Sequence, residues 1–187
     1  MNVLKAMDAR RAVRSYTPRA VEVASIRVLL HAAVQAPSAM NEQLWLFAVV
    51  QNTATLKGWS DRAKAMLLDQ AVVDPKSRNY RSSLEDPEFN IFYDASSLIV
   101  IGVAERGTYT DADCWLAAEN LMLAACDAGL GTCPIGFAVP VLNTREAKEE
   151  LRFPHAGVIV APIVVGHPST TPPPILRKTP HVMSWLR

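Results

Sequence analysis

The sequence predicts a mixed α/β or α+β fold built in layers, and three observations support this prediction. Three apolar runs have the length of buried strands, and segments with helical spacing of apolar residues lie between them, a pattern typical of helices packed on a sheet. The chain has 187 residues, of which 50% are hydrophobic, enough for one sizeable core. We therefore expect a single domain over residues 1–187, without internal repeats or an interdomain linker.

The N-terminal half is expected to contain three helices and one strand. The second helix should end where Pro37 follows Ala36, because proline disfavours helical geometry at the residue before it. The apolar run Trp-Leu-Phe-Ala-Val-Val lacks alternation, so we expect a strand that is buried on both faces. The expected elements are helices over 1–11, 21–35 and 55–71, a polar loop over 38–43 and a strand over 45–50.

The C-terminal half is expected to supply the other two strands. The strongest helical pattern places Trp115 on an apolar face and is apolar nearly all round, which favours the core or a subunit interface. Asn143, followed three residues later by Glu146, has the spacing of a capping box. The expected elements are strands over 97–103 and 157–166, helices over 111–129 and from Asn143, a turn over 130–137, and a surface loop or lid over 73–90.

Charge and cysteine content narrow the function classes. The net charge is +1 and the pI about 7.8, which argues against a general nucleic-acid or membrane-surface binder. No apolar run reaches the length of a membrane span or resembles a signal peptide, so a cytoplasmic protein is expected. Cys114, Cys126 and Cys133 form no CxxC pair, which predicts neither a disulfide framework nor a metal site.

Three arginines, Arg10, Arg11 and Arg14, lie within five residues of an otherwise nearly neutral chain. The planar guanidinium donates paired hydrogen bonds and keeps its charge, so it suits a phosphate better than other side chains do. A local excess of this kind indicates a small anionic ligand. The alternative is a solvated basic turn, which is how most charge runs are used.

Four segments, in this order, carry a resemblance to a known family. They read Arg-Arg-Ala-Val-Arg over 10–14, Ala-Pro-Ser-Ala-Met-Asn-Glu-Gln-Leu-Trp over 36–45, Gly-Leu-Gly-Thr-Cys-Pro-Ile-Gly-Phe over 129–137, and Gly-His-Pro at 166–168 through Arg-Lys at 177–178. In order and spacing, the sequence from residue 3 to the tail resembles the nitroreductase family of FMN-dependent oxidoreductases. The resemblance implies an α+β, nitroreductase-like fold with a central, mostly antiparallel sheet flanked by helices. It also implies an intertwined homodimer with FMN at the interface and a C-terminal tail, 167–187, over the partner subunit.

The resemblance assigns several residues to the cofactor. The arginine cluster, where Ala12 replaces the serine habitual in the family, would contact the FMN phosphate and the polar edge of the flavin. The 37–41 loop would approach from the other subunit, the 134–136 turn would lie along the isoalloxazine, and the basic pair in the tail would reach the phosphate. Alternatively, these segments could serve as a loop closure, a plain turn and a solvated tail. The residues concerned are Arg10, Arg11, Ala12, Arg14, Pro37, Ser38, Asn41, Pro134, Ile135, Gly136, Arg177 and Lys178.

The implied activity is ping-pong transfer of two electrons. NADH or NADPH would reduce the flavin and leave, and a nitroaromatic, quinone or similar acceptor would then reoxidise it. No side chain is expected to act as a catalytic nucleophile, because the flavin carries the chemistry. The alternative is a flavin-binding storage or sensing protein without turnover of its own. Candidates for the substrate side are Arg78, Tyr80, Arg81, Phe89 and Phe92.

Overall fold

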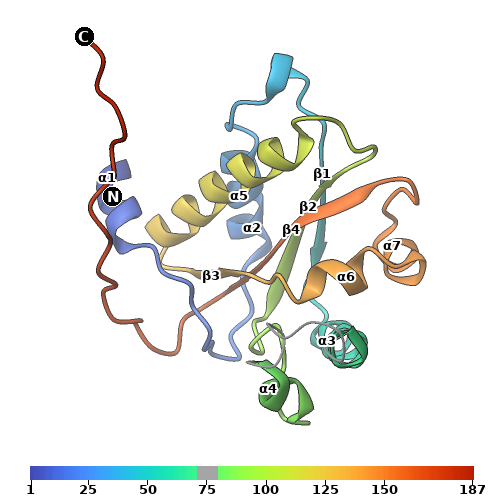
Figure 1. The fold of residues 1–187 in the computed structure, drawn as a ribbon. Helices are drawn as coiled ribbons and strands as arrows, with labels where there is room; N and C mark the ends of the chain where they lie inside the picture. The colour runs from blue at the N-terminus through green and yellow to red at the C-terminus, as the bar shows by residue number, and fades with distance from the viewer. Residues whose placement is uncertain (71–79) are drawn as a thin grey trace.

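A four-stranded antiparallel sheet forms the centre of the computed structural model, which describes residues 1–70 and 80–187 (Figure 1). Its strands lie in the order β1-β2-β4-β3 and every neighbouring pair is antiparallel. The α+β class with a flanked antiparallel sheet is therefore confirmed. The strands are β1 (Trp45–Val50), β2 (Ser97–Val103), β3 (Gly131–Pro134) and β4 (Val158–Gly166).

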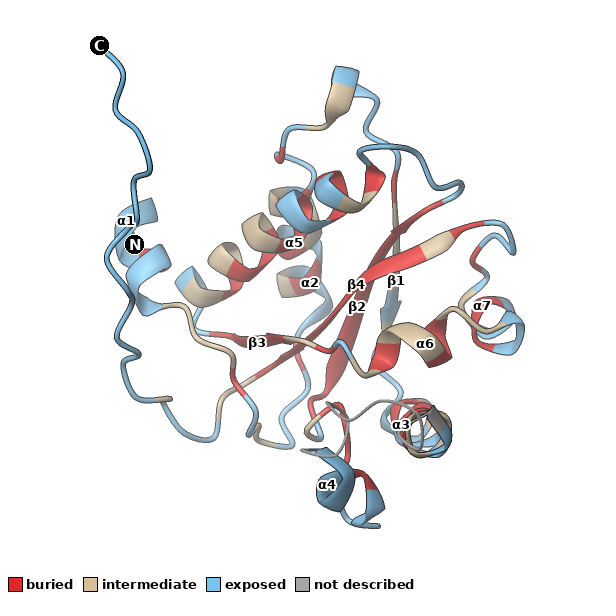
Figure 2. Ribbon diagram, viewed as in Figure 1, coloured by how far each residue is buried: buried red, intermediate tan, exposed pale blue. Residues whose placement is uncertain are grey.

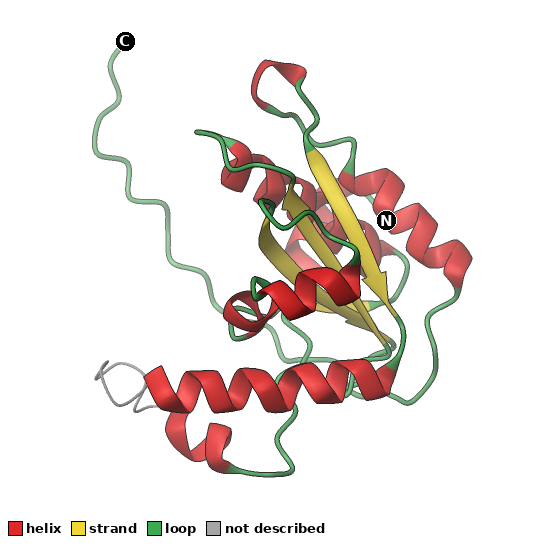
Figure 3. Ribbon diagram, turned by 90° about the vertical axis from the view of Figure 1, so that its right-hand side faces the viewer, coloured by secondary structure: helices red, strands yellow, loops and turns green. Residues whose placement is uncertain are grey.

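Helices cover both faces of this sheet (Figures 1 and 3). One face packs against α2 and α5, and the other packs against α3 and α6. Alternate residues of β2 point to opposite faces, so Ile99 joins the first core and Val100 the second. The helices are α1 (Val3–Ala9), α2 (Val23–Ala33), α3 (Thr53–Gln70), α4 (Arg81–Glu85), α5 (Thr110–Asp127), α6 (Ala138–Leu142) and α7 (Arg145–Leu151), with a 3-10 turn, η1, at Ala39–Asn41.

Burial on both faces was predicted correctly for the central strand and wrongly for β1. Every residue of β2 is buried, because β1 and β4 flank it and helices cover both its faces (Figure 2). Strand β1 is an edge strand whose residues after Trp45 are half-buried or, at Val49, exposed. An apolar run without alternation is compatible with both positions, so the sequence alone did not distinguish them.

The surface of α5 distinguishes between the two positions expected for Trp115, the core and a subunit interface. Within one chain 43% of Trp115 is exposed, and the neighbouring Leu116 is exposed as well, so the indole does not lie in the core. The core-facing residues follow the helical spacing of Cys114, Ala118 and Leu121. A helix that is apolar nearly all round offers more than one candidate inner face, and here the large indole lies outside the core.

Two local predictions near the end of the chain are wrong. The segment predicted as a turn over 130–137 contains β3, because its backbone pairs with β4, a partner distant in the sequence. The N-cap of α7 is Thr144, whose side chain accepts from the Ala147 N–H, and not Asn143. The half-buried Asn143 amide instead connects α6 to β4: it donates to Val139 O and Ile159 O, each at 2.9 Å, and accepts from Ile159 N.

The 73–90 stretch, predicted as an irregular loop or lid, lies partly outside the described residues. Its described part contains the short helix α4, anchored by the buried Leu84. Within 1–70 and 80–187, none of the helices combines the length and apolar character needed to cross a bilayer.

Candidate functional site

The arginine cluster lies along the edge of the sheet beside β3. Helix α1 ends at Ala9, and the chain then runs extended. The Val13 N–H donates to Thr132 O at 2.9 Å, and Ala12 forms a parallel bridge with Thr132. The first and third family-like segments, far apart in the sequence, are therefore joined by backbone hydrogen bonding.

Two facing glycines allow this close approach. Gly131 of β3 pairs with Gly166 of β4. A Cβ built on Gly131 would lie 2.8 Å from the Val13 side chain, and one on Gly166 would lie 2.6 Å from the Tyr16 ring. The Tyr16 hydroxyl donates to Val13 O at 2.7 Å. The absence of two side chains thus creates the space in which the arginine segment packs.

The three arginines have different surroundings. Arg14 is exposed and lines a cavity of about 450 Å³ together with Pro134 and Gly136. Its guanidinium carbon lies 6.0 Å from the centre of the Tyr93 ring, within the range of a cation–π contact. No acidic side chain in residues 1–70 and 80–187 pairs with Arg14, so its charge is available to an anion.

Arg10 and Arg11 are already partly engaged within the chain. Arg10 Nε forms an ion pair with Glu119 of α5 at 3.2 Å. Arg11 Nη1 donates to Asp8 O at 2.5 Å and to Arg10 O at 2.8 Å, so it caps the end of α1. Both line a smaller cavity of about 170 Å³ that Thr171 and Pro172 also border.

The 134–136 turn offers one free backbone donor to the larger cavity. Pro134 has no N–H, and the Ile135 N–H donates to Pro162 O at 2.9 Å. The Ile135 side chain is buried in the second core. The Gly136 N–H finds no backbone acceptor among the described residues, and a Cβ built on Gly136 would meet nothing within 4 Å. Gly136 therefore presents an open backbone surface to the cavity.

Aromatic side chains form the wall of the same cavity. Tyr80 packs edge-on against Phe137, with ring centres 5.3 Å apart, and Phe89 packs edge-on against Tyr93 at 5.9 Å. The sequence-based candidates Tyr80 and Phe89 are thus part of this wall. Phe92 was a wrong candidate, because it is fully buried in the core.

The remaining two substrate-side candidates differ in outcome. Arg81 forms an ion pair with Glu85 at 2.7 Å on the surface of α4 and does not line the cavity. Arg78 lies outside the described residues.

Tyr93 and Cys133 also line the cavity, and the sequence did not predict either of them as a site residue. Tyr93 adopts the left-handed conformation with φ 55°, which no sequence signal indicated. Burial raises the pKa of the Tyr93 hydroxyl and that of the Cys133 thiol. Both groups therefore keep their protons at neutral pH, and they line the cavity as neutral groups beside the cationic Arg14.

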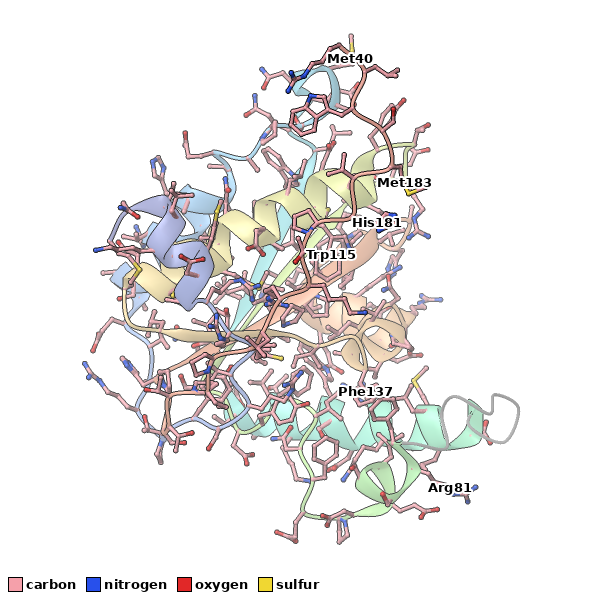
Figure 4. All side chains as sticks on the ribbon, turned by 60° about the vertical axis from the view of Figure 1, so that its left-hand side comes forward. Met40, Arg81, Trp115, Phe137, His181 and Met183 are labelled. Carbon is pink, nitrogen blue, oxygen red and sulfur yellow. The ribbon has the colours of Figure 1, made fainter. Side chains whose placement is uncertain are left out.

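Within one chain, the 37–41 loop lies away from the arginine segment. It lies at the N-terminal end of α5, where the Ala39 N–H donates to the Asp113 carboxylate at 3.2 and 3.3 Å (Figures 1 and 4). Ser38 Oγ accepts from the Gln43 N–H, and Asn41 Oδ1 accepts from Gln43 Nε2. Ser38 and Asn41 thus close the loop, which is the structural alternative considered for them, while Pro37 is exposed.

The C-terminal tail leaves the body of the chain soon after β4. The Thr17 N–H donates to His167 O at 2.8 Å, and the Ser169 N–H donates to Ser15 O at 3.1 Å. Beyond this point the tail extends away from the sheet (Figure 3). Arg177 and Lys178 are exposed and do not line either cavity beside the arginines.

No group of three or more His, Cys, Asp and Glu side chains suited to a metal ion occurs within the described ranges. What the site offers is a cation, a free backbone N–H and an aromatic wall around one open cavity. This set suits a planar, electron-rich or anionic ring.

Comparisons with known proteins agree with this geometry. The chain is 30% identical, over 170 residues, to an Archaeoglobus fulgidus protein with the provisional name NADH dehydrogenase/NAD(P)H nitroreductase, covering 88% of this chain and 84% of the relative. It is 28% identical over 176 residues to an FMN reductase [NAD(P)H] of Bacillus subtilis, covering 89% of this chain and 66% of that protein.

Solved structures share the fold. A Bacteroides fragilis nitroreductase with bound FMN superposes with a TM-score of 0.82 at 24% identity, covering 100% of this chain and 98% of that one. A nitroreductase with bound FMN from Desulfitobacterium hafniense gives 0.80 at 25% identity, covering 97% and 99%. The family model described as "Nitroreductase family" matches residues 7–167. The chain therefore belongs to the nitroreductase family.

Proposed function

We propose that this chain is an FMN-dependent oxidoreductase that transfers two electrons from NADH or NADPH, by ping-pong exchange, to a nitroaromatic, a quinone or a similar acceptor. One observation carries the proposal: Arg14, which no described carboxylate pairs, and Gly136, whose N–H has no backbone acceptor among the described residues, line the same aromatic-walled cavity. FMN bound there would supply the two-electron chemistry. The names of the relatives, an NAD(P)H nitroreductase and an FMN reductase, support the same activity.

The residues of the cavity match the needs of a flavin. Arg14 would stabilise negative charge on the polar edge of the reduced ring, since a preorganised cation acts most strongly where water is excluded. The Gly136 N–H would donate to the ring, because Pro134 has no N–H and that of Ile135 is already used. Arg10 and Arg11, beside the smaller cavity, would bind the phosphate.

We further propose a homodimer in which the partner subunit completes each site with Pro37, Ser38, Asn41, Arg177 and Lys178. The surface supports this proposal, because large apolar side chains are exposed on separate elements. Leu4 of α1 is 68% exposed, and Trp185 in the tail is 74% exposed. Other exposed apolar residues on the same elements and on α5 are Val3, Met7, Trp115, Leu116, Leu176, Met183 and Leu186; Figure 4 labels Trp115 and Met183.

The visible spectrum of the purified protein tests the proposal directly. A yellow protein that bleaches on anaerobic addition of NADH or NADPH and recovers its colour with a quinone or nitroaromatic is expected. Yellow protein that never bleaches would instead identify a storage or sensing protein. Colourless protein that fails to take up FMN would contradict both functions, and a monomer that retains FMN would contradict the shared site.

A further inference from the structure

Two buried polar side chains of α3 hold the backbone on either side of Phe89, which is part of the cavity wall. Lys64 Nζ donates to three backbone oxygens: Asp86 O at 2.9 Å, Phe89 O at 2.9 Å and, more weakly, Pro87 O at 3.4 Å. One helical turn earlier, Ser60 Oγ accepts from the Ile91 N–H at 3.0 Å. Lys64 is 7% exposed and Ser60 is fully buried.

The ammonium of Lys64 is fully used by these contacts. It has three N–H donors, and the structure supplies three carbonyl acceptors for them. Its nearest carboxylate, Asp61, is 3.9 Å away and forms a closer pair with the exposed Lys57 at 2.7 Å. Lys64 is therefore committed to the backbone of 86–89 rather than to a surface ion pair.

The segment held by Lys64 determines where Phe89 lies. Residues 85–88 are exposed and offer no apolar anchor of their own. Phe89 is half-buried and forms one wall of the Arg14 cavity, in edge-on contact with Tyr93. Because Lys64 binds the carbonyl of Phe89 itself, loss of this contact releases the backbone from which the ring projects.

We infer that Lys64 is a positioning residue that sets acceptor selectivity through Phe89. Lys64 lies behind the cavity and is not among the residues that line it, so it acts on the substrate only through the segment that it holds. The inference rests on the proposed oxidoreductase function and names, within it, the residue that fixes the shape of the acceptor site.

Selectivity between acceptors of different size is the test. With the full-length protein saturated in FMN, kcat/KM is measured for benzoquinone, which has one ring, and for menadione, which has two. Lys64→Met is expected to change the ratio of the two values by about tenfold, which corresponds to 1.4 kcal/mol. The matched control is Lys57→Met on the same helix, which also loses a contact to Asp61 and should leave the ratio unchanged.

A double-mutant cycle shows whether Lys64 acts through Phe89. Phe89→Ala alone should change the ratio, and adding Lys64→Met should then produce no further change, because residues that act through one another are not additive. A wild-type ratio in Lys64→Met, or a Lys64→Met effect of full size in the Phe89→Ala background, would overturn the inference. If Lys64→Met fails to fold, Lys64→Gln, whose shorter side chain cannot reach the three carbonyls together, decides by the same criterion.

A readout independent of turnover separates this inference from the proposed function. Phe89 is half-buried and Lys64 binds its carbonyl, so chymotrypsin should cut after Phe89 faster in Lys64→Met than in wild type, and no faster in Lys57→Met. If the wild-type protein reduces no acceptor, the proposed function is refuted, and the cleavage rates still show whether Lys64 holds the segment. Unchanged cleavage in Lys64→Met would overturn the positioning role.

Discussion

Gly136→Ala separates folding from cofactor binding at the turn that faces the cavity. A Cβ at this position would meet no heavy atom within 4 Å, and the φ angle of Gly136 is not in the left-handed region. The substitution therefore costs the fold little, and we expect the free energy of unfolding to change by no more than about 0.5 kcal/mol. In the absence of flavin, the variant should be as stable as the wild type.

Binding of the flavin should respond differently. A hydrogen bond from the Gly136 N–H to the ring requires about 2.9 Å, whereas a methyl group keeps a carbon neighbour about 3.5–4.0 Å away. The added Cβ should therefore lengthen this hydrogen bond or break it. Loss of one such bond costs about 1 kcal/mol or somewhat more, so the Kd for FMN should rise about tenfold.

Two measurements on the same samples decide the outcome. Urea unfolding of the FMN-free protein gives the stability, and quenching of flavin fluorescence gives the affinity. Gly58→Ala is the control, because Gly58 lies on α3 away from the cavity and its added Cβ also meets nothing within 4 Å. Unchanged stability together with unchanged FMN affinity in Gly136→Ala would show that the flavin does not lie against this turn.

Three further changes test other parts of the site. Arg14→Ala should weaken FMN binding by about 1.5–3 kcal/mol, the scale of a charge-assisted contact; equal affinity in a fluorescence titration would assign the arginine another purpose. Gly131→Ala would place a Cβ 2.8 Å from Val13, so unfolding should become easier by about 1–3 kcal/mol, visible as a lower Tm. Burial raises the pKa of Tyr16, so the folded chain binds this proton more tightly than the unfolded chain, and the stability that it provides is lost as the pH rises above about 10. Urea unfolding from pH 8 to 11 should show a shallower decline for Tyr16→Phe, and parallel declines would count against the assignment.

The parts of the fold that follow from local pattern were predictable from the sequence. Strand β2 was predicted with its observed ends, because the apolar run over 97–103 has the length of a strand that is buried on both faces. Strand β3 was not predicted, since a four-residue stretch with glycine and proline resembles a turn, and only its pairing with β4 makes it a strand. Trp115 shows the same limit, because a helix with apolar residues on several sides does not reveal which side faces the core.

The sequence indicated some of the residues that line the larger cavity, but not how the fold brings them together. The sequence indicated Arg14 and Gly136 through family-like segments, and the structure places both at one cavity. It gave no sign of Tyr93, because that residue reaches the cavity from two consecutive left-handed residues, Tyr93 and Asp94, with φ 55° and 54°. Neither residue is a glycine, so the sequence carries no local preference for the left-handed conformation that would predict this turn.

The different roles of the three arginines follow from how their segment is held. The backbone of Ala12 and Val13 is fixed to Thr132, and Val13 packs into the space that Gly131 leaves free. Arg10 and Arg11 precede this anchor and lie where helix α1 ends, so the carbonyls of α1 and the carboxylate of Glu119 engage them. Arg14 follows the anchor and reaches the aromatic cavity with its charge unpaired by any described carboxylate. A cluster that is uniform in sequence therefore divides into two arginines with structural contacts beside the smaller cavity and one arginine at the aromatic cavity, whose position the backbone anchor fixes.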